Sequence, residues 1–497
     1  MASAAPNPYD VTDYPSRPYA QAHPERMGTV AALFGLHPSR PSNCRVLEIG
    51  CNDAANLLAL AVAYPKSEFV GFDLAAKPVE RAIERVKQIG IENVRVFQGD
   101  VTQVGGELGQ FDYIIAHGLY SWVPAPVRQH ILRVCRELLQ PNGIAYISYN
   151  AYPAGHMRDM VRAMTMFHAQ NFSAPADRAR EAKAVIRMTL RMAAADDVHY
   201  RGVLQRELEA MDQVGEALVI HDLLAESNDS FYFTQVAAEL AAHRLKYVGD
   251  AEIEEMHLDG ELAEFLTGAP DKIAREQYLD FMTYRRFRRT LVCGQEAELL
   301  EAPDVNTLRS MQFSSRFEPV GECDFHSTRP QEFKSGKSSK VISIDQPLAK
   351  AALVAISQAW PRALSFAATA EDAAKLLGSA REDCSDEKLT VYLWQAVAAG
   401  AVQPSLERTP VAPGVSERPL ATALARRQAA EASFAFTLVH STVELSPTLR
   451  RILPLLNGTR DRAAMLREFN SAGREPINAE QLGSALQRAW KLGLLAA

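Results

Sequence analysis

The sequence lacks the features that mark exported, metal-binding and membrane-spanning proteins. Its six cysteines form no CxxC pair and no Cys/His ligand spacing, which argues against a zinc site and a disulfide framework and favours a reducing compartment. No stretch approaches the roughly 20 apolar residues of a membrane span, and residues 1–25 show neither the basic nor the apolar segment of a signal peptide. We therefore expect a soluble, cytoplasmic protein with no metal and no membrane partner.

An excess of positive charge is also missing. The 497 residues carry a formal net charge of −7, and 47% of them are hydrophobic. Because non-specific affinity for a phosphate backbone comes from clustered Lys and Arg, this balance argues against a nucleic-acid partner. The length predicts about two to four domains with sizeable cores.

Short apolar runs alternate with helical patterns from residue 44 to residue 150, which is typical of a doubly wound parallel sheet. The runs consist almost entirely of Val, Ile, Phe and Tyr, which predicts strands buried on both faces. The predicted fold class is therefore α/β with a Rossmann-like sheet. We expect strands at 45–50, 68–74, 94–100, 111–118 and 144–150, and helices at 54–64, 77–90 and 125–139.

The remainder of the chain predicts helical additions to this sheet. Residues from about 155 to 222 predict a helical insertion between the fifth and sixth strands, and 287–294 or 308–317 could supply a further strand. In the later part, two segments share an order of three helices ending near a Gly, which is compatible with tandem winged-helix-like units. The expected domains are 1–325 (core 40–153, insertion about 155–222, sheet-completing part 223–325), a polar linker at 326–342, and a mainly helical region at 343–497 that docks a substrate or partner.

The strongest chemical signal lies where the first two strands end. Glu48, Gly50 and Asn52 precede a helix, and Asp73 closes the second strand. A Gly-containing turn lets a cofactor approach the backbone closely, and an acid about 20 residues further on can accept hydrogen bonds from two ribose hydroxyls. NAD and S-adenosylmethionine (SAM) are both bound in this way. SAM is the better ligand, because the turn lacks the GxGxxG pattern that a pyrophosphate requires.

Two later strand ends complete the predicted cofactor pocket. Asp100 is placed for the adenine amino group, and residues after His117 border the methionine part, because the carboxyl ends of parallel strands share one edge. The predicted cofactor contacts are Glu48, Gly50, Asn52, Asp73, Leu74, Asp100, Val101 and His117. Four residues of a Pro-rich N-terminal arm are expected to fold over the cofactor: Tyr9, Tyr14, Tyr19 and His23.

The chain resembles the Rossmann-like SAM-dependent methyltransferases through LEIGCNDAANL (47–57), VGFDLA (70–75) and FQGD (97–100). HGLYSWVP (117–124), SYNAYP (148–153), SNDSFYF (227–233) and YLDFMTYRRFRRTLVC (278–293) resemble bacterial methyltransferases with a methyltransferase regulatory domain, a family that includes protein-lysine methyltransferases. The resemblance implies Glu48, Gly50, Asp73 and Asp100 as cofactor contacts. Asn52 stands where the family has its usual second glycine.

Methyl transfer is an in-line displacement, so the protein mainly has to align a nucleophile and exclude water. If that nucleophile is a lysine amine, neutralising it at pH 7 costs roughly 4–5 kcal/mol from its reference pKa of about 10.4. A desolvated aromatic pocket would lower that pKa, and a carbonyl oxygen of Asn150 could orient the amine. The predicted catalytic residues are Tyr120, Trp122, Tyr149, Asn150 and Tyr152.

Each of these assignments has a competing structural interpretation. Tyr and Trp often pack at strand ends with no ligand, and Asp100 could simply cap the next segment. The basic run Arg285, Arg286, Arg288 and Arg289 is expected to be solvated or ion-paired, and Met160, Met164, Met166, Met188 and Met192 are expected to fill a core.

The leading function is methylation of protein lysine side chains, which requires a protein substrate. The alternatives are a small-molecule methyltransferase and a SAM-binding scaffold without turnover. A homodimer is left open.

Overall fold

The computed structural model describes residues 7–257, 260–336, 340–471 and 476–497. Its largest layer is a sheet with the strand order β3-β2-β1-β4-β5-β8-β7, and β6 pairs with β5. The strands are β1 (Arg45–Ile49), β2 (Glu68–Asp73), β3 (Val94–Gln98), β4 (Phe111–Ala116), β5 (Leu139–Ala151), β6 (Ser230–Phe231), β7 (Leu245–Asp250) and β8 (Phe287–Gly294). β1 to β5 run parallel, whereas β8 is antiparallel to β5 and β7. The predicted Rossmann-like α/β fold is confirmed.

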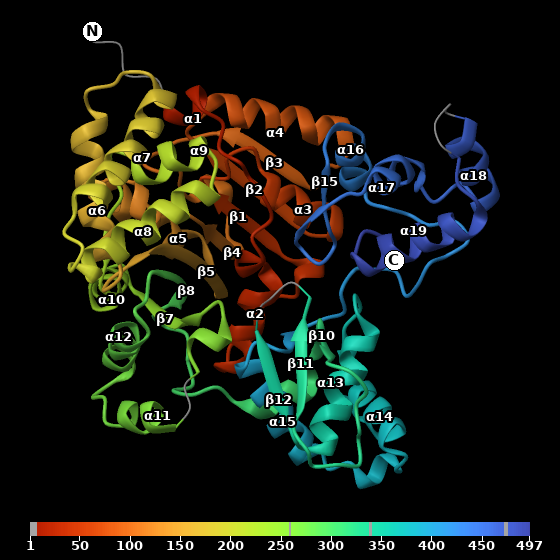
Figure 1. Ribbon diagram of the computed structural model, residues 1–497. Coiled ribbons are helices and arrows are strands. Elements are labelled where there is room, and N and C mark those ends of the chain that lie inside the picture. The colour runs from red at the N-terminus through yellow and green to blue at the C-terminus, as the bar shows by residue number, and fades with distance from the viewer. Residues whose placement is uncertain (1–6, 258–259, 337–339, 472–475) are drawn as a thin grey trace.

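Helices cover both faces of this sheet (Figure 1). α2 (Pro24–Leu33), α3 (Ala55–Ala63) and α4 (Ala76–Ile89) pack on one face, and α5 (Ala125–Leu138) and α10 (Phe233–Ala242) pack on the other. Neighbouring residues of one strand enter different cores: Val46 packs on the α3 side and Leu47 on the α5 side. This two-sided burial is why the strands read as continuous apolar runs.

A helical block follows β5 in the chain and precedes β6, and it forms its own small core (Figure 1). Its elements are α6 (Gly155–Ala169), α7 (Pro175–Met192), α8 (Val198–Gln213), α9 (Glu216–Leu218) and the π-helix η5 (Val219–Leu223). Met164 and Met166 pack against that core. Met160, Met188 and Met192 are 40%, 60% and 81% exposed, so the prediction that they fill a core was wrong; their helices turn these positions away from the neighbouring helices.

The sheet is completed by β7 and β8, and the segment between them is helical. It contains η6 (Ile253–Glu255), α11 (Gly260–Thr267) and α12 (Lys272–Thr283). Of the two segments expected to supply a further strand, 287–294 is β8 of the main sheet, whereas 308–317 contributes to smaller sheets elsewhere.

The middle part of the chain combines short strands with three helices. β9 (Gln312–Ser314) pairs with β13 (Leu364–Ser365) and β14 (Gln403–Ser405), and β11 (Gln331–Ser335) lies between β10 (Phe317–Pro319) and β12 (Val341–Ile344). The helices are α13 (Pro347–Ala359), α14 (Phe366–Leu377) and α15 (Asp386–Ala398). Part of the expected linker is therefore strand β11, in which buried Phe333 alternates with exposed Glu332 and Lys334. Residues 337–339 of that linker lie outside the described residues.

The last part of the chain has a similar helical order and a separate core. Its elements are α16 (Ala423–Glu431), β15 (Phe434–Phe436), β16 (Thr442–Glu444), α17 (Pro447–Ile452), α18 (Arg462–Ser471) and α19 (Ala479–Lys491). Gly400 follows α15 and Gly493 follows α19, both with positive φ, as the repeated helix-then-Gly pattern predicts. We call residues 417–497 the C-terminal unit. Its helix α16 packs against α3 and α4 of the first domain (Figure 1).

Candidate functional site

The turn that follows β1 has an unusual backbone. Gly50, Asn52 and Ala54 all have positive φ, of 71°, 50° and 56°. Glycine takes this conformation without strain, and Asn is among the few other residues that adopt it readily. Asn52 therefore adopts the left-handed backbone conformation that a glycine would take at this position. Gly50 N–H and Cys51 N–H donate to the carbonyl of Phe72, which brings the β1 and β2 ends together.

Asp73 links the two turns. Its Oδ2 accepts from the Asn52 N–H at 2.8 Å, and its Oδ1 accepts from the Ala75 N–H at 2.9 Å. Burial raises the pKa of this carboxyl, and the backbone hydrogen bonds oppose that rise. Each carboxylate oxygen keeps a second acceptor position, so Asp73 can still receive ribose hydroxyls. Leu74 beside it is 58% exposed, as a residue bordering an open pocket would be.

Glu48 supplies a buried carboxyl oxygen that lacks a partner. Its Oε1 accepts from the Asn56 Nδ2 at 3.0 Å, whereas its Oε2 is buried and has no hydrogen bond from any described residue. Asn52 Oδ1 is buried and unpartnered in the same way. Buried acceptors without donors are rare in folded proteins, and both belong to the predicted cofactor set. SAM carries hydroxyl and ammonium donors, so these residues fit it.

Asp100 lies at the β3 end and caps a turn. Its Oδ1 accepts from the Thr102 N–H at 2.9 Å, which is the capping role that competed with adenine binding. Val101 beside it is buried in the core on the α5 side. Asp100 is half-buried at the same sheet edge as Asp73, so its second carboxylate oxygen stays available to a ligand.

His117 ends β4 and is held neutral. Its Nδ1 lies 3.0 Å from the Tyr146 hydroxyl, and the Tyr19 ring centroid lies 3.8 Å from its own. Burial lowers the pKa of His117 to about 3, with further lowering by Arg289 and Arg17. At pH 7 this imidazole is therefore neutral, and it lies against the Tyr19 ring.

The N-terminal arm crosses the carboxyl edge of the sheet. Asp10 in α1 (Pro8–Val11) accepts from the Lys77 N–H of α4 at 2.8 Å, and the Thr12 carbonyl lies 2.8 Å from the His221 Nε2 of the helical block. Tyr9 stacks on His221 at 4.3 Å. Tyr9 and Tyr19 therefore lie at the sheet edge that was predicted to bind the cofactor, whereas His23 caps α2 instead.

Two of the predicted aromatic residues lie in the core. The Tyr120 hydroxyl donates to the Glu239 Oε2 at 2.5 Å, and the Tyr149 hydroxyl lies 3.0 Å from the Thr290 Oγ1. Both rings are fully buried on the α5 and α10 face of the sheet. The structure therefore does not bring Tyr120 and Tyr149 to the pocket.

Trp122 and Tyr152 are only half-buried. Trp122 ends the short helix η4 (Tyr120–Trp122) that follows β4. Tyr152 stacks on His156 at 3.9 Å and donates from its hydroxyl to the Asp159 Oδ2 at 2.8 Å. Tyr232 lies beside the pair, at 5.0 Å from Tyr152, so an aromatic cluster follows the β5 end.

Asn150 at the end of β5 has a fixed orientation. Its backbone N–H donates to the Ser121 Oγ at 2.8 Å, and its Nδ2 donates to the Asn228 Oδ1 at 2.7 Å. Asn228 in turn donates to the Asp222 carbonyl. The Asn150 Oδ1 accepts no hydrogen bond from the described part of the chain. The 227–233 motif indicated a family resemblance, but the sequence did not predict that Asn228 accepts the hydrogen bond that orients Asn150.

The basic run at the start of β8 is ion-paired, and only part of it is buried. Arg288 is fully buried, and its guanidinium contacts Asp250, Glu276 and Asp280 at 2.9–3.1 Å. Arg285 pairs with Asp280 and Glu255, in agreement with the expected ion pairs. Arg286 pairs with Glu207 but its side chain is 51% exposed, so the buried ion pairs engage Arg285 and Arg288 and not the whole run.

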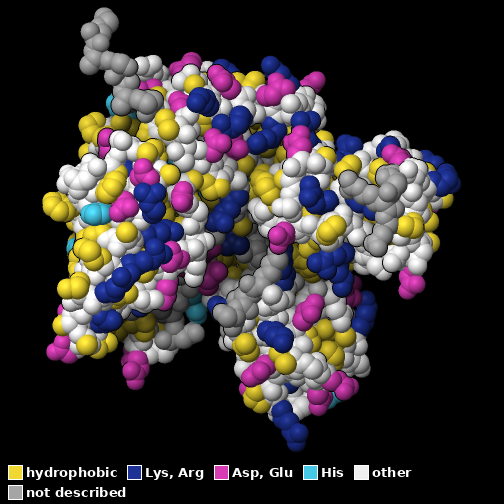
Figure 2. Space-filling model, turned by 45° about the horizontal axis from the view of Figure 1, so that its top comes forward, with side chains coloured by type: hydrophobic (Ala, Val, Ile, Leu, Met, Phe, Trp, Pro, Cys, Tyr) yellow, Lys and Arg dark blue, Asp and Glu magenta, His cyan; other side chains and the backbone are white. Residues whose placement is uncertain are grey.

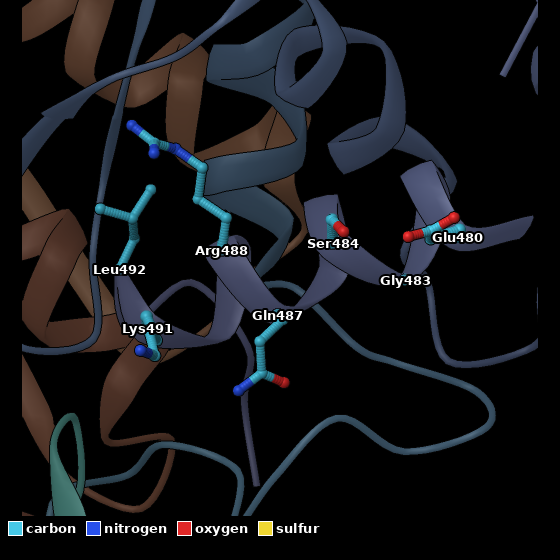
Figure 3. A pocket seen from close by; sticks show the side chains of 7 residues that line it. All are labelled: Glu480, Gly483, Ser484, Gln487, Arg488, Lys491 and Leu492. Atoms are coloured by element: carbon cyan, nitrogen blue, oxygen red, sulfur yellow. The ribbon is translucent and has the colours of Figure 1, made fainter. Parts of the chain in front are cut away.

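Two hollows lie in other parts of the described chain. A shallow depression runs along α19, lined by Arg488, Lys491 and Glu480 with small polar residues (Figure 3). A cavity of about 300 Å³ is lined by the start of α2, by the middle part and by the C-terminal hairpin, with His23 and His440 among its lining residues. In the described ranges, no cluster of three or more His, Cys, Asp or Glu side chains could hold a metal ion, and no helix is long and apolar enough to cross a bilayer.

Three parts of the chain match known protein families. Residues 46–143 match the family described as methyltransferase domain, residues 215–294 match the predicted methyltransferase regulatory domain, and residues 417–484 match the PKMT, C-terminal winged helix domain. The uncharacterized protein RP789 of Rickettsia prowazekii (strain Madrid E) is 33% identical over 394 residues, which are 77% of this chain and 71% of that protein.

Solved structures agree along nearly the whole chain. The structure of PKMT2 from Rickettsia typhi has a TM-score of 0.85 at 25% identity, and covers 97% of this chain and 100% of that one. The same protein in complex with AdoHcy gives a TM-score of 0.84. The resemblance inferred from the sequence motifs is confirmed, and so is SAM as the cofactor. The chain belongs to the class I, Rossmann-like SAM-dependent methyltransferases that carry a methyltransferase regulatory domain and a PKMT-type winged-helix domain.

Proposed function

We propose that this enzyme transfers methyl groups from SAM to lysine side chains of a protein substrate. The observation that carries the proposal is the likeness to PKMT2, which extends over 97% of the chain and includes the C-terminal unit. A small metabolite needs little docking surface, whereas a protein substrate gives the added domains a use. Methylation of a small molecule remains an outcome of the test below.

Cofactor binding is assigned to residues at one edge of the sheet. Gly50 and Asn52 let the ligand approach the backbone, Asp73 takes the ribose, and Glu48 offers its free oxygen to an ammonium group. Leu74, Asp100 and Val101 border the adenine, and His117 borders the methionine part. SAM, when bound, supplies an electrophilic methyl group attached to a positively charged sulfur.

The methyl acceptor must be a neutral amine, since a protonated lysine has no free electron pair. At pH 7 neutralisation costs roughly 4–5 kcal/mol for an unperturbed lysine, and desolvation reduces that cost. We assign the orientation of the amine to the Asn150 Oδ1, which is free to accept an N–H because Asn228 holds the other end of the amide. We assign the aromatic contacts of the lysine side chain to Trp122 and Tyr152. Tyr120 and Tyr149 pack in the core on the α5 and α10 face of the sheet, next to β5.

Contacts with a protein are assigned to the helical block. Met160, Met188 and Met192 are exposed there together with Phe167, which is 75% exposed. Exposed methionines adapt to varied apolar partners. Basic and acidic side chains are interspersed on the face shown in Figure 2, which favours a protein over a nucleic acid. A second copy of the chain would also suit this apolar face, and light scattering would detect such a homodimer. The six free cysteines fit a cytoplasmic location.

The test is transfer of a labelled methyl group from SAM into a cell lysate that is then separated into proteins and small molecules. We expect label in proteins, located on lysine by peptide mass spectrometry. Asn150→Ala should reduce this transfer while SAM binding persists, and Asn142→Ala, an exposed asparagine near the other end of β5, is the matched control. Label confined to the small-molecule fraction would overturn the protein substrate and leave the SAM site standing.

A further inference from the structure

The C-terminal unit reaches into the first domain at one buried hydrogen bond. His440 lies on the hairpin between β15 and β16, and its Nε2 is 2.8 Å from the Oδ1 of Asn56 in α3, 384 positions earlier in the chain. His440 and Asn56 are 4% and 3% exposed. Asn56 follows the turn of Gly50 and Asn52 directly, so this contact abuts the cofactor edge.

The hydrogen-bond roles at Asn56 are fixed by chemistry. The Tyr19 backbone N–H can only donate, and it lies 3.0 Å from the same Asn56 atom as His440 does, so that atom is the carbonyl oxygen. His440 must therefore carry its proton on Nε2 and donate as well. The Asn56 Nδ2 is left to donate to the Glu48 Oε1 at 3.0 Å. One amide thus joins the N-terminal arm, the C-terminal unit and the Glu48 carboxyl.

The hairpin holds His440 in place for this contact. His440 has a φ of 52°, a conformation that L residues with a side chain rarely adopt. The hairpin tip is closed by hydrogen bonds from the Thr437 N–H to the Ser441 carbonyl and from the His440 N–H to the Thr437 carbonyl. The His440 ring also packs edge-on against His23, at 4.8 Å between centroids. The hairpin backbone therefore orients the imidazole of His440 toward Asn56.

We propose that the C-terminal unit is a working part of the cofactor site: His440 fixes Asn56, Asn56 orients Glu48, and docking of the unit is thereby coupled to SAM binding. His440 is a positioning residue, since Asn56 lies between it and Glu48. Coupling of this kind is reciprocal, so whatever the unit adds to SAM affinity, SAM returns to the docking of the unit. A partner that displaces the C-terminal unit would consequently weaken SAM binding. The inference rests on SAM binding and does not require a lysine substrate.

Calorimetric titration of the full chain with SAM tests the positioning role. Loss of one buried donor typically changes affinity by about tenfold, so His440→Ala should raise the SAM Kd by about that factor, with the KM for SAM rising in parallel and kcat at saturating SAM kept within about twofold. His440→Gln retains a side-chain N–H donor and should recover part of the affinity. Thr442→Ala, an exposed residue of the same hairpin, is the matched control. A folded His440→Ala protein whose SAM Kd equals that of Thr442→Ala would overturn the proposal.

Amide hydrogen exchange on the unaltered chain tests the reciprocal effect and needs no variant to fold. Saturating SAM should slow exchange in the hairpin from residue 437 to residue 441, although that segment is not one of the residues assigned to cofactor contact. Exchange in the α18 segment, at the far side of the unit, is the internal reference. Unchanged exchange at 437–441, with slowed exchange at the turn of Gly50 and Asn52, would show SAM binding without coupling and would also overturn the proposal.

Discussion

SAM binding should release a proton from Glu48. Burial raises the pKa of this carboxyl to about 8, against the partial relief that the Asn56 hydrogen bond gives, and the nearby Asp73 and Asp53 raise it further. A carboxyl with that pKa is roughly 90% protonated at pH 7. An ammonium group placed beside the free Oε2 would favour the carboxylate, so binding should expel close to one proton per site.

The size of the effect follows from the pKa. Below pH 8 the fraction of protein with an ionised Glu48 falls about tenfold per pH unit, so the SAM Kd should weaken by roughly that factor per unit between about pH 7.5 and 6. Higher pH is avoided because a reference α-amino group itself titrates near 7.7–8.0. Titrations in buffers of different ionisation enthalpy give the number of protons released.

Glu48→Gln isolates the titration. The glutamine keeps a carbonyl oxygen for the Asn56 Nδ2 and cannot ionise, so both the proton release and the slope of Kd with pH should vanish. Glu80→Gln, an exposed acid on α4, should leave both unchanged. Proton release near zero in the unaltered protein, or an equal slope in Glu48→Gln, would refute the assignment of the ammonium group to Glu48.

The same carboxyl makes the SAM-free protein sensitive to pH. Its pKa is raised in the folded state, so its contribution to stability is fully present below about pH 4.5 and is lost as pH rises through about 8. The upper bound on that loss is about 5 kcal/mol, at 1.36 kcal/mol per pKa unit. Urea unfolding at pH 5 and pH 8 should show a smaller decline for Glu48→Gln than for the unaltered protein.

Three further outcomes are expected. Asp73→Ala should weaken SAM binding at least about tenfold with an unchanged circular dichroism spectrum, because it removes the acceptor assigned to the ribose and the link between two turns; near-normal binding would contradict the placement of the ribose. Trp122→Ala should spare the SAM Kd and lower kcat, and an unaffected rate would remove Trp122 from the pocket. Arg288→Ala should destabilise the fold by about 3–5 kcal/mol in urea unfolding, because the buried Asp250 and Glu276 would lose their ion-pair partner; a loss below about 1 kcal/mol would contradict this account.

The fold was predictable because its signals are local. Each strand of the parallel sheet is an apolar run bounded by turn residues, and the carboxyl ends of such strands meet at one edge whatever lies between them in the chain. This rule predicts that Gly50 and Asp73 lie close together. The hydrogen bonds from the N–H groups of Gly50 and Cys51 to the Phe72 carbonyl show that the ends of β1 and β2 are in contact.

The orientation of individual side chains was harder to predict. Tyr149 and Asn150 are neighbours in β5, and successive side chains of a strand point to opposite faces. Tyr149 faces the α5 core, and Asn150 lies away from it with its amide held by Asn228. Both were predicted for the pocket because a sequence fixes the alternation of a strand without its phase when both faces are apolar. The wrong prediction that Met188 and Met192 fill a core has the same cause, because helical periodicity does not show which face of a helix stays exposed to solvent.

The contact between His440 and Asn56 marks a deeper boundary of sequence reasoning. A polar residue at the start of a helix is explained locally as a cap, and a histidine at a hairpin tip is explained as a turn residue, so neither position predicts a distant partner. The contact between His440 and Asn56 depends on how α16 and its hairpin pack against α3. That packing is determined by apolar surfaces of the C-terminal unit and of the first domain. What distinguishes the pair is visible only in three dimensions: an amide whose carbonyl accepts from two separate parts of the chain while its nitrogen holds a buried acid. Because Asn56 contacts Tyr19, His440 and Glu48 at once, the proposed coupling makes SAM binding depend on the C-terminal unit, which contains none of the sequence motifs assigned to the cofactor.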